Sequence, residues 1–358
     1  MIGPFFQNIL YFSITFIAGL YLIEINVKNK TKLYFQNFFY IILAVSASLL
    51  FGLQDGSFRL INDIGMYRRQ YDSINNFSDI FLQKTDFLFY FIFYITKKIY
   101  HDFNFTLSFI SLLYNIFIYL ALKKISKNYY FLFFILLSFF FYYNLGSNVL
   151  RQGLGFSFYL YGVAYFFNNN IKKYLLYSII ALGFHFSFFL PIFILLGMKY
   201  FKKLDLLLLL YTAASIVSLL RIKVLDTLLK IPIIAGVYSN RTDFNYNYYD
   251  YKVGFRPDFF AFNTFFLILF YFTYKKIISP EEKFKYYSFL GTYIILSAYF
   301  FLMFEFPFSD RYGILSWVFI PILFYPYINK IPMKNNPIGL SFIYFFCVTI
   351  YIIFNFKT

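Results

Sequence analysis

Apolar runs of roughly 17–24 residues recur along the whole 358-residue chain, and they limit its possible folds more than any other feature. A helix needs about 20 apolar residues to cross a bilayer core about 30 Å thick. Charged residues make up only 13% of the chain, whereas a soluble domain carries about 25%. The runs are continuous rather than alternating, which argues against a transmembrane β-barrel. The sequence therefore predicts an all-α polytopic membrane protein, a single integral membrane domain over residues 1–358.

The runs predict about ten full transmembrane spans and one ambiguous segment, 174–198. The spans are 4–26, 34–52, 104–122, 129–146, 149–167, 204–220, 256–274, 287–305, 312–328 and 337–355. Residues 174–198 are long enough for one span. A single span there would place the later lysine clusters on the side opposite to the earlier ones. A re-entrant helical hairpin with its tip near Gly183, His185 and Ser187 keeps all of them together, and we favour it.

In the hairpin topology the lysine clusters of the short connections between spans lie in the cytoplasm, as the positive-inside rule requires. These clusters contain Lys28, Lys30, Lys32, Lys123, Lys124, Lys127, Lys172, Lys173, Lys199, Lys202, Lys203, Lys275, Lys276, Lys283, Lys285, Lys330 and Lys334. All arginines then lie on the other side: Arg59, Arg68, Arg69, Arg151, Arg221, Arg241, Arg256 and Arg311. The planar guanidinium suits bidentate binding of phosphate or carboxylate. The arginines therefore predict that the outer face handles anionic groups.

Two larger loops are predicted on the outer, periplasmic side, at 53–103 and 221–255. The stretch 87–99 in the first loop is too short for a span and ends in two lysines, which predicts an interfacial helix. Non-helical backbone at membrane depth is tolerated only where it is buried in protein or lines a cavity. The hairpin tip around His185 therefore itself indicates a site.

Composition excludes several classes of function. The net charge of +16 comes largely from lysines in short loops, where they set orientation and meet membrane lipid, so it does not indicate nucleic-acid binding. A single cysteine, Cys347, excludes an intramolecular disulfide and cysteine metal clusters. Phosphate-binding glycine loops and the HExxH zinc motif are missing, and two histidines cannot build a common zinc site. We therefore expect chemistry that needs neither a metal nor a cofactor.

Several groups of residues are candidates for this chemistry. In the first outer loop, Arg59, Asp63 and Tyr67 are spaced by four and would share one helix face. That face is either a solvated surface with an internal Asp–Arg pair or a cationic surface at the mouth of a cavity. Near the start of a span, Arg151 and Gln152 lie slightly inside the outer interface. A charge at that depth either extends to the headgroups or belongs to a functional site.

His185 is a further candidate, either a satisfied core histidine or a group that accepts a proton or donates a hydrogen bond. The remaining candidates are outer residues that follow later in the chain. A loop dense in Tyr, Asn and Asp, 239–259, contains Arg241 and ends at Arg256 and Asp258. It is either a flexible polar loop or a sugar-binding surface. Another outer helix junction carries Asp310, Arg311 and Tyr312.

Taken together, these motifs resemble the EpsG/Wzy family of bacterial polysaccharide polymerases. The resemblance rests on Arg59-x₃-Asp63-x₃-Tyr67, LRQG at 150–153, HFS at 185–187, VGFRPDF at 253–259 and DRY at 310–312. It implies an inner-membrane glycosyltransferase, with its active site facing the periplasm, that joins undecaprenyl-pyrophosphate-linked oligosaccharides. The growing chain would be transferred to the non-reducing sugar of a new lipid-linked repeat unit. A Wzz-type chain-length regulator is the implied partner.

For such a reaction we expect Arg151 and Arg311 to bind one pyrophosphate and Arg59 and Arg256 to lie near the other. His185 or Asp63 would act as the base or orient the acceptor. Three alternatives remain. An O-antigen ligase would use the same donor, a flippase or transporter would move the lipid-linked glycan, and a membrane O-acyltransferase would use a histidine base. We find no internal repeat of the kind that many transporters show.

Overall fold

The computed structural model describes residues 63–83, 85–126, 129–222, 253–306 and 308–330, with isolated positions at 45, 345–346 and 348–349. The described residues contain helices and connecting segments and no strand, which confirms the all-helical prediction. The predicted spans 4–26, 34–52 and 337–355 lie outside these ranges, apart from the isolated positions. Chain contacts divide the protein into unit 1 (Met1–Phe189 and Phe324–Thr358) and unit 2 (Leu190–Leu323).

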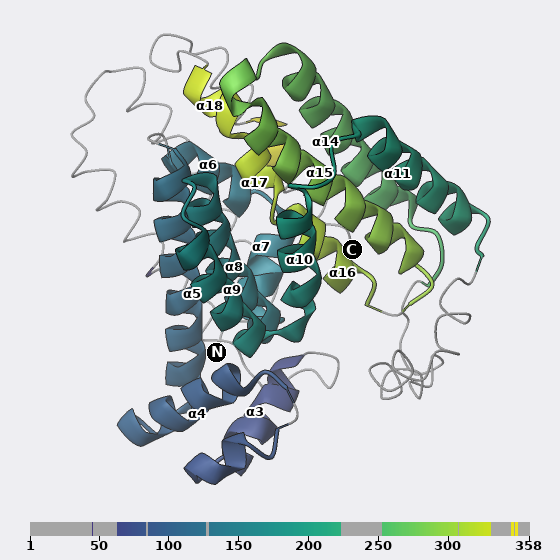
Figure 1. The fold of residues 1–358 in the computed structure, drawn as a ribbon. Helices are drawn as coiled ribbons and strands as arrows, with labels where there is room; N and C mark the ends of the chain where they lie inside the picture. The colour runs from purple at the N-terminus through teal and green to yellow at the C-terminus, as the bar shows by residue number, and fades with distance from the viewer. Residues whose placement is uncertain are drawn as a thin grey trace. The chain divides into compact units, whose positions relative to one another are not determined.

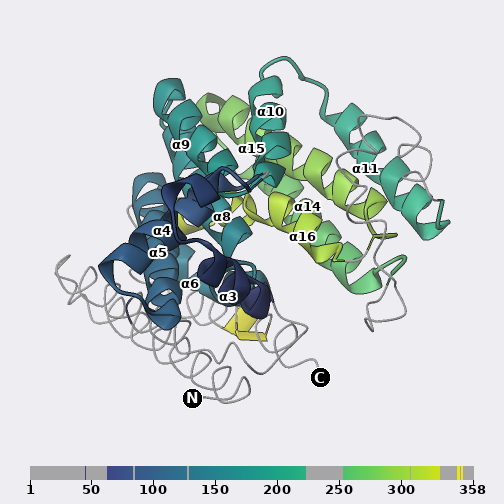
Figure 2. The ribbon, with the colours of Figure 1, turned by 90° about the horizontal axis from the view of Figure 1, so that it is seen from below.

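Unit 1 is built around helix α8, against which α5 and α9 both pack (Figure 1). In chain order the helices are α3 (Asp63–Ser73), η1 (Phe77–Ile80), α4 (Phe87–Ile99), α5 (Phe103–Ile125), α6 (Tyr129–Leu137), α7 (Phe140–Ser147), α8 (Leu150–Phe167), α9 (Ile171–Phe184), η2 (Phe186–Phe188) and, after unit 2, α18 (Tyr325–Lys330). The short helices α3 and α4 lie together at one end of this unit, and Figure 2 views the unit from that end.

Small residues on α8 allow its neighbours to approach closely. A Cβ added at Gly153 would lie 2.1 Å from the backbone oxygen of Leu145 on α7. At Gly155 an added Cβ would lie 2.7 Å from the ring of Phe188 in η2. Close backbone approach at small residues is the usual way in which helices pack inside a membrane. The glycine of the LRQG motif thus has a packing role, separate from that of its arginine.

Unit 2 contains three longer helices that run side by side, α11 (Leu204–Leu219), α14 (Pro257–Lys276) and α15 (Pro280–Leu302). The remaining helices are α10 (Phe189–Gly197), α16 (Asp310–Trp317) and α17 (Ile320–Leu323). The buried amide of Asn263 on α14 connects this helix to α15 and α16. Its Oδ1 accepts hydrogen bonds from Trp317 Nε1 at 3.0 Å and from the Tyr293 hydroxyl at 3.2 Å. This polar contact fixes α14 against α15 and α16.

Two predicted spans, 129–146 and 312–328, are interrupted in the structure and do not form one continuous helix each. The span 129–146 is broken between α6 and α7, where the Ser138 hydroxyl donates to Phe134 O at 2.8 Å. Such back-bonding to the carbonyl four residues earlier bends helices. The span 312–328 is divided among α16, α17 and α18. Pro321 and Pro326 lie in this stretch, and each lacks the N–H that would continue a helix.

Other predicted elements agree with the structure. Spans 104–122, 149–167, 204–220, 256–274 and 287–305 correspond to α5, α8, α11, α14 and α15. The predicted helix 87–99 is α4, and its interfacial position stays a prediction. Two stretches within the described residues, Phe103–Ile125 and Asp310–Ile328, are long and apolar enough to cross a membrane. These features are those of a helical membrane protein, and the number of spans stays a prediction.

The ambiguous segment 174–198 is not one continuous helix. Helix α9 ends at Phe184, His185 is extended with φ −158° and ψ 117°, and a single 3₁₀ turn precedes α10. With 14 residues, α9 is about 21 Å long, which is shorter than a bilayer core. The interruption lies where the hairpin tip was predicted. The re-entrant course of its two arms stays a prediction.

Candidate functional site

In unit 1, the lysines of the connections that follow α5 and precede α9 lie at the opposite end from Arg151. At one end, the ammonium groups of Lys124 and Lys173 lie 4.3 and 5.1 Å from the ring centroid of Tyr165, near the end of α8. Two connections predicted to share one side of the membrane therefore meet. Arg151 lies at the beginning of α8, which is 18 residues or about 27 Å long. The arginine end of the unit also carries α3, with the exposed Arg68 and Arg69.

Unit 2 shows the same separation. Lys275 and Lys276 end α14, and the Lys283 ammonium lies 5.4 Å from the Tyr274 ring centroid at that end. At the other end of α15, Gly254 N donates to Phe304 O at 2.8 Å. This bond brings the beginning of α14, with Arg256, to the turn that leads into α16, with Arg311. The Nε of Arg221 would lie 4.0 Å from a Cβ placed on Gly254, so it belongs to this end too.

A buried ion pair stands at the arginine end of unit 1. The Nη1 of Arg151 donates to Asp86 Oδ2 at 3.0 Å, and the side chains are 22% and 6% exposed. Asp86 immediately precedes α4 and has left-handed backbone angles, φ 62° and ψ 31°. Non-glycine residues adopt this conformation at a cost of about 1 kcal/mol or more, so the surrounding contacts must hold it. The strain indicates that the carboxylate position matters more than local backbone preference.

The other oxygen of Asp86 reaches the helix break. Its Oδ1 accepts a hydrogen bond from the backbone N–H of Phe186 at 3.3 Å. Phe186 opens the 3₁₀ turn directly after His185. One carboxylate therefore connects the beginning of α8 to the interruption between α9 and η2. Sequence reasoning did not identify Asp86. The available signal was an acid directly before an apolar helix, which normally indicates only a helix cap.

Two tyrosines surround the Arg151 guanidinium. Its central carbon lies 5.7 Å from the ring centroid of Tyr67 on α3. Tyr90 on α4 lies beside Arg151 and Gln70, and burial raises the pKa of its phenol more than the arginine charge lowers it. The phenol is therefore neutral at pH 7 and adds no charge. Among the described residues, Arg151 Nε is buried and has no hydrogen-bond partner. An unsatisfied buried donor costs about 1–3 kcal/mol.

Asp63 stands one helical turn before Tyr67 on α3, as the four-residue spacing predicted. Its backbone N–H donates to Asn148 Oδ1 at 3.2 Å, in the connection between α7 and α8. This bond ties the first described turn of α3 to the segment that carries Arg151. Asp63, Tyr67 and Arg151 are therefore brought together. Arg59, the first residue of the motif, lies outside the described residues.

His185 uses one ring nitrogen to stabilise the break in its helix. Its Nδ1 accepts the backbone N–H of Ser187 at 3.2 Å. In the neutral imidazole the proton is then on Nε2, which makes Nε2 a donor. This arrangement favours the interpretation of His185 as a hydrogen-bond donor that orients a substrate. To act as a base through Nδ1, it would have to give up the bond to Ser187.

In unit 2, Arg256 forms a bidentate ion pair with Asp258. The Nε–Oδ1 and Nη2–Oδ2 distances are 3.2 and 2.9 Å, and the side chains are 19% and 28% exposed. The guanidinium also lies 4.3 Å from the Phe259 ring centroid. An ion pair between residues two positions apart stabilises the start of α14. It also presents a planar cation at the arginine end of the unit.

The DRY motif at 310–312 is divided between surface and interior. The Arg311 guanidinium lies 4.7 Å from the ring centroid of Phe308, which has a left-handed φ of 58°. Tyr312 is buried, and its ring lies 5.8 Å from that of Tyr299. Asp310 opens α16, where a negative charge favours the helix dipole. Tyr312 therefore has the contacts of a core residue, whereas Asp310 and Arg311 are half-buried.

The predicted site residues thus fall into two groups. Asp63, Tyr67, Arg151 and His185 gather with Asp86 in unit 1, and Arg256, Asp258, Asp310 and Arg311 lie at the arginine end of unit 2. Gln152 is 1% exposed and belongs to the interior of unit 1. Arg241 lies outside the described residues. The expected pairing of Arg151 with Arg311 joins residues of different units and stays a prediction.

Comparison with known proteins gives one match. A family model described as the EpsG family covers residues 37–358. No curated protein and no solved structure matches the chain.

Proposed function

The chain belongs to the EpsG family, and on this premise we propose that it is a glycosyltransferase that polymerises lipid-linked oligosaccharide repeat units into a surface polysaccharide. Family membership supports a polysaccharide polymerase-type function. The observation that carries the proposal is the Arg151 site. A guanidinium that Asp86 holds in one orientation and that is still 22% exposed is suited to an anionic ligand, and it lies at the arginine end of unit 1.

We place the reaction at the periplasmic face of the bacterial inner membrane. The lysine end of each unit is the cytoplasmic end under the positive-inside rule. The arginine ends would then face the periplasm, where lipid-linked repeat units carry their pyrophosphate at the membrane interface. The proposed donor and acceptor are both undecaprenyl-pyrophosphate-linked oligosaccharides. A chain-length regulator of the Wzz type is a proposed partner.

The transfer exchanges one bond for another. The bond between the anomeric carbon of the growing chain and its pyrophosphate oxygen breaks, and the electron pair leaves with the pyrophosphate. A hydroxyl oxygen on the non-reducing sugar of the new repeat unit bonds to that carbon and loses its proton. Because glycosyl pyrophosphate is already an activated donor, the protein must mainly orient the acceptor and stabilise the departing charge.

The unit 1 residues fit these tasks. Arg151 donates to the departing pyrophosphate, and the ion pair with Asp86 fixes the orientation of the guanidinium. Asp63 is the residue that accepts the proton of the attacking hydroxyl, because a carboxylate has acceptor oxygens for it. His185 donates through Nε2 and orients the acceptor. Tyr67 forms the wall on which the Arg151 guanidinium rests.

Polymerisation requires two lipid pyrophosphates to be bound at once. One guanidinium cannot serve both, which would explain why arginines recur along the chain. Arg256 and Arg311 provide the cationic groups of unit 2, and Arg59 is proposed to add another. Because Arg256 is already paired with Asp258, its contribution requires exchange of that carboxylate for a phosphate of similar geometry.

Deletion of the gene in its host, with plasmid complementation, tests the proposal. The surface polysaccharide is separated on a silver-stained gel, and the glycan on the lipid carrier is analysed by mass spectrometry. A polymerase predicts that the ladder collapses to a single repeat unit and that single units accumulate on the carrier. Full-length polymer on the carrier would instead identify a ligase. An unchanged ladder and capsule would refute the proposal.

A further inference from the structure

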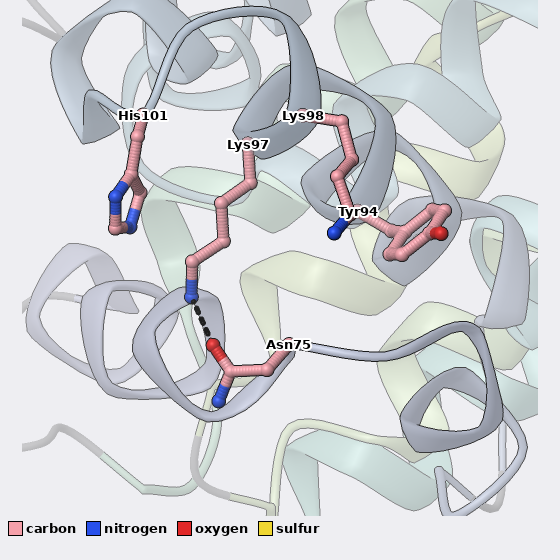
Figure 3. A pocket seen from close by; sticks show the side chains of 5 residues that line it. All are labelled: Asn75, Tyr94, Lys97, Lys98 and His101. Carbon is pink, nitrogen blue, oxygen red and sulfur yellow. Dashed lines mark hydrogen bonds between the residues drawn. The ribbon is translucent and has the colours of Figure 1, made fainter.

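A cavity of about 300 Å³ lies in unit 1, apart from the Arg151 site, between the segment that follows α3 and the end of α4. It is lined by Asn75, Tyr94, Lys97, Lys98 and His101 (Figure 3). No carboxylate is among the lining residues. In Figure 3, Lys97 points toward Asn75, with His101 on one side and Lys98 with Tyr94 on the other. The lining is therefore cationic and rich in hydrogen-bond donors.

Lys97 lines this cavity, and its ammonium group is fully hydrogen-bonded within the protein. Its ammonium lies 3.0–3.1 Å from the backbone oxygens of Tyr71, Asp72 and Ile74 at the end of α3, and 3.0 Å from Asn75 Oδ1. A cation is favourable at a helix C-terminus because it complements the helix dipole. The contact also uses the acceptor oxygen of Asn75, so the amide NH₂ group is what remains for a ligand.

Lys98 and His101 are not used in this way. The Lys98 ammonium lies 5.6 Å from the ring centroid of Tyr94, and His101 packs against Tyr71 with ring centroids 6.1 Å apart. Within the described part of the chain, neither side chain forms a hydrogen bond or an ion pair. An ammonium always donates, and an imidazole N–H donates in either protonation state. Both groups can therefore donate to an oxygen anion in the cavity.

Two nearby acids, Asp79 and Asp102, have backbone partners. Asp79 Oδ2 accepts the backbone N–H groups of Asn75 and Asn76, each at 2.8 Å. Asp102 Oδ1 accepts the N–H of Phe105 at 2.6 Å. Neither forms an ion pair with Lys98 or His101. The positive charge of the cavity therefore remains available to a ligand.

An exposed aromatic surface adjoins the cavity. The side chains of Phe77, Phe81 and Phe91 are 51%, 70% and 37% exposed. The Phe77 ring centroid lies 5.4 Å from that of Phe81, 6.3 Å from that of Phe91 and 5.8 Å from that of Tyr94, which lines the cavity. An apolar surface beside cationic donors is the arrangement by which proteins rest on a membrane interface.

We propose that this cavity binds the headgroup of an anionic glycerophospholipid of the surrounding bilayer. The phosphodiester would accept hydrogen bonds from Lys98, His101 and the Asn75 amide, and the acyl chains would run along Phe77 and Phe91. A zwitterionic headgroup would bring a second cation next to Lys98, so the site prefers anionic lipid. This lipid site is separate from the proposed glycosyl transfer and does not depend on it.

Retained lipid is the direct readout. The purified full-length protein is equilibrated in mixed micelles with equal amounts of phosphatidylglycerol and phosphatidylcholine, and bound lipid is counted by native mass spectrometry. The wild type should retain phosphatidylglycerol at least about fivefold over phosphatidylcholine, since a surface charge contact contributes about 1 kcal/mol. The double variant Lys98→Gln/His101→Gln should lose this preference. Lys97 is left intact because it holds α3 to α4.

Lys275→Gln is the matched control. Lys275 also lies in the last turn of an apolar helix, 5.5 Å from the ring centroid of a tyrosine four residues earlier, Tyr271. The Lys275→Gln protein should retain the wild-type preference for phosphatidylglycerol. Thermal unfolding should show that the wild type, the double variant and this control are all folded. Equal retention in the double variant, or equal loss in the control, would overturn the proposal. Displacement of phosphatidylglycerol by millimolar inorganic phosphate or by undecaprenyl phosphate would assign the cavity to another phosphate source and would also overturn it.

Discussion

The guanidinium of Arg151 donates to the carboxylate of Asp86 at 3.0 Å, although 65 positions separate the two residues in the chain. The same carboxylate accepts the N–H of Phe186 at 3.3 Å. Asp86 thus joins an arginine that the sequence predicts to be functional to the helix break after His185. A carboxylate held on two sides fixes the direction in which the remaining arginine donors point. Fixed donors of this kind stabilise developing charge with little reorganisation.

Replacing Asp86 should therefore affect the orientation of the Arg151 guanidinium as well as the stability of the protein. Asp86→Ala leaves a largely buried arginine charge without its partner, which costs about 3 kcal/mol or more. Asp86→Asn keeps the shape but removes the charge, so we expect a folded protein with less polymer. The charge exchange Arg151→Asp/Asp86→Arg should recover part of the lost thermal stability without recovering polymer. Asp72→Asn, on the exposed face of α3, is the control. Full polymer from the exchanged protein would show that the pair is only structural.

His185 has two roles that can be tested separately. Its Nδ1 stabilises the turn, and its Nε2–H is proposed to orient the acceptor. In His185→Asn, the amide oxygen can replace Nδ1 as acceptor for the Ser187 N–H, whereas the ring with its Nε2–H is lost. We expect this variant to reach wild-type abundance in membranes but to make little polymer. His185→Phe should lower both. If His185→Asn restores normal polymer lengths, the histidine only caps the turn.

The glycine of the LRQG motif should be intolerant of any side chain. A Cβ on Gly153 would lie 2.1 Å from Leu145 O, a backbone atom that cannot rotate away. Gly153→Ala should therefore lower the unfolding temperature, with a cost of about 1–3 kcal/mol or more from overpacking. Gly197→Ala is the control, since nothing lies within 4 Å of its added Cβ. Equal unfolding temperatures for the two variants would contradict the close contact of α7 with α8.

Acid should loosen the turn at η1. The N–H groups of Asn76 and Asn75, together with the charge of Lys97, hold the pKa of Asp79 below its usual range. Because the folded pKa is lower than that of the unfolded chain, the stabilisation is present above about pH 4 and is lost as pH falls through the folded pKa. Hydrogen exchange at Asn75 and Asn76, corrected for intrinsic rates, should show this loss of protection. Asp79→Asn should show no such transition.

The sequence predicts much of this structure, and what it misses has physical causes. Five spans, including α5, α8 and α14, were predicted because a long apolar run is a local signal. The breaks within 129–146 and 312–328 were missed because a run that stays apolar does not show where a helix bends. Lysine clusters predicted which helix ends share a side, and contacts within each unit agree. Asp86 was missed because its partner is distant in sequence, and no local spacing reveals such a pair.

The most direct test of the central claim is the rate at which the purified protein releases undecaprenyl pyrophosphate from the host's own lipid-linked repeat units. Release should accompany each glycosidic bond formed. If Arg151 stabilises the departing pyrophosphate, Arg151→Ala should lower this rate by about 10²–10³-fold, as losing one donor to developing charge does in other enzymes. Arg151→Lys should be intermediate, and Arg69→Ala, on exposed α3 surface, should match the wild type. A folded Arg151→Ala protein that releases the carrier at the wild-type rate would contradict the account.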